Sequence, residues 1–243
     1  MTKSLRFLPD WIQEWWIWLT AIFLLTFVSF WPSFFSAIIH VETGLIIHGM
    51  SAIAWMLLTI IQALLIKSKW RKHHRTVGYI ALILAIILIG SGFQVMQSML
   101  LRDISTEGAI SLVAIKFLYF DTIILILFSV FLWLAIKAAR NRRIDLHMRL
   151  MTCTAIMPLE AALERTYIYG LPSLVPTFNV AFYCSVITLI TILVILFGIE
   201  KRLNRSRWPF LALLICFVIM LLTTDIVANS NWFQSYATYY SNI

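Results

Sequence analysis

Seven long apolar stretches follow one another along the chain, and no other feature of the sequence limits its fold so strongly. A helix that crosses the hydrocarbon core of a bilayer needs about 20 predominantly apolar residues. The stretches run over residues 15–38, 44–66, 76–100, 110–136, 150–169, 177–199 and 209–228. Of the 243 residues, 61% are hydrophobic and only 12% are charged, which is about half the charged fraction of a soluble domain. We therefore expect an all-α integral membrane protein, with residues 1–243 forming a single transmembrane domain of seven transmembrane helices.

The basic residues predict how this bundle is oriented. Lys and Arg accumulate in the cytoplasmic segments of membrane proteins. All of the 19 basic residues except Arg102, Lys116 and Arg165 fall in the amino-terminal segment or close to every second connection. We expect a cytoplasmic amino terminus, an outer carboxyl terminus and a location in the bacterial inner (cytoplasmic) membrane. Anionic lipid then accounts for the net charge of +8, and no nucleic-acid partner is expected.

Polar side chains inside the apolar stretches predict a cavity in the outer half of the bundle. They are His48, Gln94, Gln97, Lys116, Asp121, Glu160, Glu164, Arg165 and Asp225. Four carboxyls in this set face two basic side chains and one histidine, so ion pairing leaves two carboxyls to be protonated, hydrated or bound to a cation. We expect an outward-open polar cavity, with a kink of the fifth span at Pro158. His48 and Glu160 are candidate metal ligands. The alternative is that the polar groups only join helices by hydrogen bonds.

A second candidate site lies at the inner face, where the third and fifth stretches enter the bilayer. His74 and His147 each lie within a basic connecting segment, KSKWRKHHRTVGY and AARNRRIDLHMRLM. The two segments form a weak internal repeat, for which convergence is the alternative, because basic anchors at the interface are common. Histidines from two neighbouring helices are the axial ligands of b-type haem, and arginines bind its propionates. We expect Arg75 and Arg149 in that second role. The alternative is that both histidines anchor their hairpins among lipid phosphates.

The second stretch carries a regular polar pattern. His48, Trp55 and Gln62 are seven residues apart, and seven residues of α-helix bring side chains back to within about 20° of the same face. The pattern therefore predicts that one interior seam of this helix runs from the outer cavity towards the cytoplasmic interface.

Two motifs resemble those of known membrane proteins. They are H-x6-W-x6-Q followed by HR-x2-G, at residues 48–78, and H-x-R-L-M at residues 147–151 with Arg165 further along. Both resemble a group of uncharacterised bacterial polytopic inner-membrane proteins, and the second also resembles cytochrome-oxidase assembly factors. The histidine pair is loosely similar to that of transmembrane b-type cytochrome reductases. Those proteins have a second, outer pair, but the fourth stretch here has no histidine, so the resemblance implies one haem at most.

These observations favour membrane redox or haem and metal handling, with the assembly of a respiratory complex as one setting. Two alternatives stay open. One is a proton- or cation-coupled transporter or channel subunit that uses Asp121 and Glu160 near mid-depth. The other is a non-catalytic subunit that binds lipid or acts as a scaffold. The expected partners are membrane lipids and either a respiratory-complex subunit or a small cation. We find no catalytic motif of a nucleophilic enzyme, phosphate-binding loop or metalloprotease.

Overall fold

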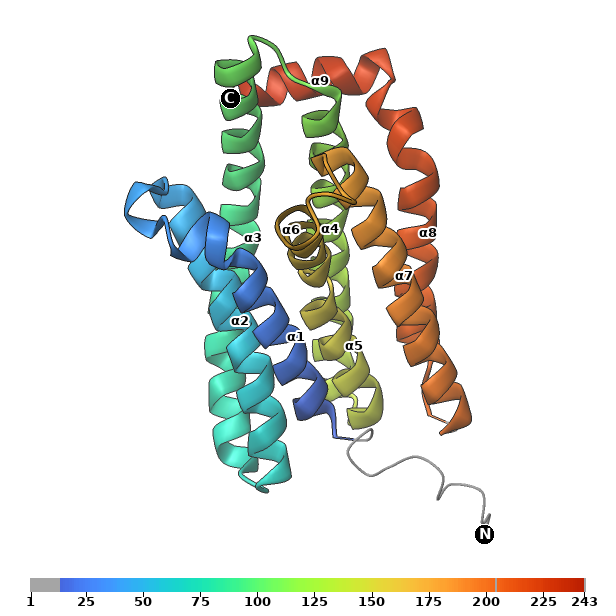
Figure 1. Cartoon of the computed structure of the whole chain (residues 1–243). Helices are drawn as coiled ribbons and strands as arrows, with labels where there is room; N and C mark the ends of the chain where they lie inside the picture. Colours follow the sequence, from blue (N-terminus) through green and yellow to red (C-terminus); the bar gives the residue numbers. More distant parts are fainter. Residues whose placement is uncertain (1–13, 204, 243) are drawn as a thin grey trace.

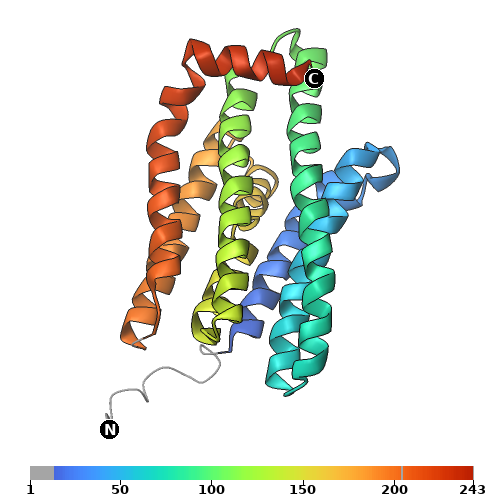
Figure 2. The same cartoon turned by 180° about the vertical axis from the view of Figure 1, so that it is seen from behind.

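The computed structural model describes residues 14–203 and 205–242, and within them it contains helices and no strand. The elements are α1 (Trp15–Phe30), the π-helical turn η3 (Trp31–Phe35), the 3-10 turn η4 (Ile38–His40), α2 (Thr43–Lys67), α3 (Arg71–Glu107), α4 (Leu112–Arg140), α5 (Ile144–Ile156), α6 (Leu159–Gly170), α7 (Phe178–Arg202), α8 (Trp208–Ala228) and α9 (Asn231–Ser241). The long helices stand side by side in one bundle (Figure 1, Figure 2).

Six segments of the described chain are long and apolar enough to cross a membrane, namely α1 with η3, α2, α3, α4, α7 and α8. Their exposed side chains are largely aliphatic and aromatic, as expected for helices that face lipid. The predicted all-α, multi-pass membrane character is confirmed in this form. The first spanning segment, α1 with η3, ends at Phe35, before the end of its apolar stretch. The other five spanning helices run past at least one end of theirs, and α3 is the longest with 37 residues. Its end is set locally, because Gly108 adopts the left-handed φ of 75° that favours glycine.

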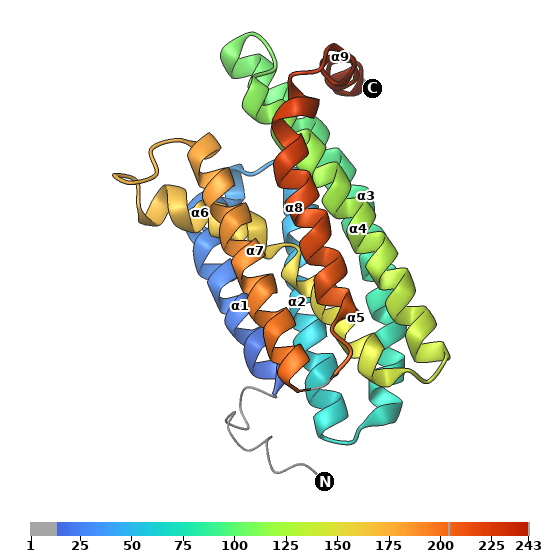
Figure 3. The same ribbon diagram turned by 90° about the vertical axis from the view of Figure 1, so that its right-hand side faces the viewer.

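The fifth predicted span, residues 150–169, is not a single spanning helix. It is divided into α5, which ends at Ile156, and α6, which begins at Leu159. Pro158 lies at the break, and proline removes a backbone donor and clashes with the preceding turn of a helix. Figure 3 shows α6 turned across the bundle, away from the direction of α5. The two helices have 13 and 12 residues, so each is too short to cross a bilayer alone.

The hairpins α2–α3 and α4–α5 share one backbone geometry. Their connections contain the two described non-glycine residues with positive φ, Lys69 at 61° and Arg142 at 57°. In each connection the following residue donates to a carbonyl five positions back, at 2.8 Å. Every residue of the second connection lies 73 positions after its counterpart (69 to 142, 74 to 147). The internal repeat predicted from the sequence therefore extends to the backbone of both hairpins.

Helix α9 was not predicted and lies across the end of the bundle that carries the α3–α4 connection (Figure 1). The Tyr240 hydroxyl donates to the Phe93 carbonyl at 2.6 Å, which ties α9 to α3. Trp232 and Tyr239 on its outer side are each 66% exposed. Tryptophan and tyrosine favour the membrane–water interface, so this face is suited to lie at the surface of the bilayer.

Candidate functional site

A cavity of about 940 Å³ lies between α1, α2, α3, α4 and the α5–α6 break. Its lining extends from Thr26 and Met56 in the middle of their helices to Asp103 and Ser111 beside the α3–α4 connection. Most of the wall is apolar, with phenylalanines on several sides. Near the mid-bundle limit, Phe128 packs edge-on against the buried Trp55, with ring centroids 5.0 Å apart. The cavity therefore has an aromatic floor and reaches the end of the bundle opposite the basic hairpin connections.

Three carboxyl groups and one guanidinium line this cavity together, from Asp121, Glu160, Glu164 and Arg165. Asp121 comes from α4. The other three come from α6, where residues four apart share a face. The charges of Asp121, Glu164 and Arg165 all act on the Glu160 carboxyl. The break at Pro158 sets the place of the three α6 residues, because it turns α6 across the bundle, where it packs against α1 and α7 (Figure 3).

The carboxyl groups of this cluster differ in their hydrogen-bond and ion-pair partners. Glu160 Oε1 accepts a 2.6 Å hydrogen bond from the Ser185 hydroxyl. Glu164 has only a long contact of 3.8 Å between Oε2 and the Arg165 guanidinium, and its Oε1 is buried with no hydrogen-bond partner. Both glutamates are 5% exposed. No sequence pattern indicated Ser185, because it lies on α7 and reaches the site only through tertiary packing.

His48 lines the same cavity from α2, and its Nδ1 lies 3.2 Å from the Ser91 hydroxyl on α3. The 73-residue offset of the hairpins relates His48 to Asp121 and Ser91 to Glu164. Among the described residues, no group of three or more His, Cys, Asp or Glu side chains could hold a metal ion. The predicted metal pair of His48 and Glu160 thus lacks a third such ligand.

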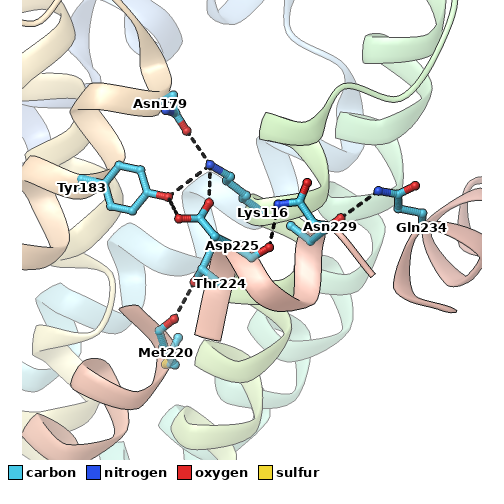
Figure 4. Close-up of polar contacts among 9 residues, drawn as sticks. Lys116, Asn179, Tyr183, Met220, Thr224, Asp225, Asn229 and Gln234 are labelled. Carbon is cyan, nitrogen blue, oxygen red and sulfur yellow. Dashed lines mark hydrogen bonds and ion pairs between the residues drawn. The ribbon is translucent and has the colours of Figure 1, made fainter. Parts of the chain in front are cut away.

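Lys116 and Asp225 form a separate cluster, outside the cavity lining, which corrects the prediction of a single polar group (Figure 4). Lys116 Nζ lies 2.7 Å from the Asp225 carboxylate and donates to Asn179 at 3.0 Å and to Tyr183 at 3.1 Å. The Tyr183 hydroxyl donates to Asp225 at 2.7 Å. Lys116 and Asp121 are five residues apart on α4, so their side chains point about 140° apart around the helix axis. This cluster joins α4, α7 and α8.

The two predicted glutamines also lie outside the carboxyl cluster. Gln97 donates to the Tyr240 carbonyl at 3.4 Å and so links α3 to α9. Gln94 packs against α2, where its amide lies 3.0 Å from the position that a Cβ on Gly44 would take. These contacts agree with the alternative interpretation, in which polar side chains join helices.

The histidine pair at the basic end of the bundle is brought together as predicted. The rings of His74 and His147 have centroids 6.5 Å apart and planes at 87°. Each Nδ1 contacts a backbone carbonyl of the preceding helix, Gln62 at 3.3 Å and Ala135 at 2.9 Å. A carbonyl oxygen only accepts hydrogen bonds, so Nδ1 carries the proton in both rings. The lone pair of each neutral imidazole is then on Nε2.

Arg149 does not have the role predicted for it. Its side chain is fully buried, and its Nε donates to Glu200 Oε2 at 2.5 Å. A second ion pair joins it to Asp145. The guanidinium is therefore committed to a network that ties α5 to α7 and is not free to bind a propionate. Arg75, by contrast, is exposed at the start of α3.

The predicted seam on α2 is present, with a different environment at each of its three positions. His48 lines the cavity, Trp55 is 1% exposed in the core, and Gln62 is partly buried near the histidine pair. Trp55 Nε1 and Gln62 Oε1 are buried without hydrogen-bond partners. Buried polar atoms without a hydrogen-bond partner are rare in native proteins, and two of them lie on this seam of α2.

Comparison of the chain with protein-family models, with curated proteins and with solved structures finds no match. The resemblances drawn from the sequence motifs therefore stay predictions, and the function has to be argued from the geometry of the two sites.

Proposed function

We propose that this chain is a multi-pass membrane protein that binds one b-type haem between His74 and His147. The observation that carries the proposal is the 6.5 Å separation of the two ring centroids. Both rings use Nδ1 for a backbone carbonyl, so Nε2 is the free nitrogen on each ring. His74 and His147 would therefore be the residues that hold the haem iron. When bound, haem would supply one-electron chemistry.

Two further features support haem at this place. Metal-bound histidines usually donate their other ring N–H to a carbonyl or carboxylate, which fixes the ring, and both histidines here contact carbonyls through Nδ1. The first turns of α3, which contain His74, also carry the exposed basic side chains of Arg71, Lys72 and Arg75. These are suited to bind propionates, so the proposal does not need Arg149.

The proposed topology has the basic end of the bundle in the cytoplasm of a bacterium, as the positive-inside rule expects. Helix α4 ends and α7 begins at opposite ends of the bundle (Figure 3). The pair α5–α6 would then form a seventh, broken crossing. Broken helices within membranes are tolerated where they are buried in protein or line a cavity, and the described α6 lines one.

The proposal is tested by the absorption spectrum of the detergent-purified protein after titration with haemin. We expect a Soret band that saturates at one haem per chain and is lost in His74→Ala and in His147→Ala. His73→Ala is the matched control, because His73 is the exposed neighbour of His74, and it should keep the band. A wild-type protein without a Soret band, or a band that survives in both ligand variants, would refute haem binding.

The cavity supports a second function, the binding and transport of protons or cations. Five Asp and Glu side chains line it against two Arg, in a chain with 11 acidic and 19 basic residues. Carboxyls within a membrane bundle commonly mark ion or proton pathways. Proteoliposomes loaded with the pH dye pyranine should show a proton flux that Glu160→Gln abolishes. Glu107→Gln is the control, since Glu107 is exposed and outside the cavity lining. Equal flux in Glu160→Gln and wild type would refute this function.

A further inference from the structure

The charge of the cavity is opposite to that of the chain. The acidic lining residues are Glu42, Asp103, Asp121, Glu160 and Glu164, and the basic ones are Arg102 and Arg165. With all of these ionised, the lining carries three excess negative charges, whereas the whole chain has a net charge of +8. A wall of low polarity strengthens the field of such charges. The cavity therefore favours a positively charged occupant.

The carboxyls deep in the cavity keep unused acceptor capacity. At the outer end, Asp103 accepts from the Ser111 backbone N–H and Glu42 from Ser98. Deeper, Glu164 Oε1 is buried without a partner, and Asp121 makes no hydrogen bond or ion pair with any described residue. An unmatched buried acceptor destabilises the protein. A donor or cation that enters from the cavity would remove this destabilisation.

The guanidinium of Arg165 is a cation of the protein itself in this cavity, but it makes no hydrogen bond to Glu164. Its Nη1 donates to the Ala161 carbonyl at 3.0 Å, and its guanidinium lies over the Phe30 ring, 4.2 Å from the centroid. The distance of 3.8 Å to Glu164 is too long for a hydrogen bond. The same contacts show that a cation fits against the aromatic wall of this cavity.

The size and lining of the cavity exclude a bare metal ion as the best occupant. Its volume of about 940 Å³ is at the upper end of the range for small-molecule sites, about 300–1,000 Å³. Phe27, Phe30, Phe34, Phe117 and Phe128 lie on its walls, whereas metal ions need several polar ligands, and the described residues offer no group of three His, Cys, Asp or Glu. An apolar wall with carboxyls at one place is complementary to a molecule with an apolar body and one charged group.

We propose that this cavity binds an organic cation, with its charge at Asp121, Glu160 and Glu164 and its apolar body against the phenylalanines. The inference rests on the second function above, cation binding in the cavity, and adds the class of ligand. It is independent of haem at the opposite end of the bundle.

Two ions of nearly the same shape and opposite charge provide the test, tetraphenylphosphonium and tetraphenylborate. Equilibrium dialysis against the purified full chain, with empty detergent micelles as the blank, measures both. We expect the cation to bind at least tenfold more tightly than the anion. Glu164→Gln and Asp121→Asn should each weaken cation binding at least tenfold, and Glu107→Gln should leave it unchanged.

Equal affinity for the two ions in the wild-type protein would overturn the proposal, and that comparison needs no variant to fold. Unchanged cation binding in the folded Glu164→Gln and Asp121→Asn proteins would overturn it as well. The pyranine assay separates this inference from transport. Selective cation binding without proton flux refutes the transport function alone, whereas proton flux without preference for the cation refutes the organic ligand alone.

Discussion

The buried ion pair between Arg149 and Glu200 allows a quantitative test of the fold. The two side chains are 0% and 1% exposed, and Arg149 Nη2 lies 2.5 Å from Glu200 Oε2. Replacing Arg149 with methionine leaves the carboxylate of Glu200 in the interior without its main partner. Breaking a buried pair in this way costs about 3–5 kcal/mol. Arg205 also acts on the Glu200 carboxylate, so the lower end of that range, about 3 kcal/mol, is expected.

The measurement is thermal unfolding of the detergent-purified protein. For a chain of this size, about 3 kcal/mol corresponds to a fall in Tm of about 6–12 °C. The double variant Arg149→Met, Glu200→Met removes both charges, and it should lie within about 1 kcal/mol of wild type. A cost below about 1 kcal/mol for Arg149→Met would show that the buried carboxylate does not depend on this partner. A double variant that loses as much stability as the two single variants together would show that the pair has no coupling energy.

Three further predictions concern packing and charge. Gly49→Ala should lower the free energy of unfolding by about 1–3 kcal/mol, because its Cβ would lie 2.5 Å from the ring of Phe34. Gly90→Ala should be neutral or stabilising, because its Cβ would meet nothing within 4 Å. Equal effects of the two changes would refute the close contact. Asp225→Asn should destabilise the protein by about 1–3 kcal/mol, which is more than Lys116→Met. The first change leaves a buried lysine, 9% exposed, without its counter-ion, whereas the second leaves an aspartate that is 56% exposed. The reverse order would contradict this prediction. Hydrogen bonds from Lys67 and Trp16 hold the pKa of Glu14 below its ordinary value. The ionised side chain therefore stabilises the fold above the ordinary carboxyl pKa, and this stabilisation is lost as the pH falls through the lowered pKa. Glu14→Gln should remove this small acid dependence of Tm, and an unchanged dependence would exclude Glu14 as its source.

The histidine pair shows how far the sequence could be used to predict a site. His74 and His147 each follow a basic connection at the same depth, so their approach required only that α3 and α5 be neighbours. The assignment of Arg149 failed because its partner, Glu200, lies 51 residues further along the chain on α7. No local pattern indicates which of several interfacial arginines turns inward to pair with a distant carboxylate.

The polar cluster was predicted only in part for the same reason. Position along a helix gives depth, and depth correctly grouped Asp121 with Glu160 and Glu164. Depth also grouped Lys116 and Asp225 with them, although the rotation of α4 and the packing of α8 place these two in a separate contact with Tyr183. The direction in which a side chain points depends on how the helices are rotated against each other.

Apolar helices of membrane-spanning length follow from the amino-acid sequence alone, because a bilayer offers no hydrogen bonds to the backbone and only a helix of sufficient length satisfies them internally. The break at Pro158 follows from it as well, as a local consequence of a missing N–H and a steric clash. Which polar groups meet depends on tertiary packing, because ion pairs and cavity walls are formed by residues far apart in the chain. Their contact depends on the packing of every helix between them.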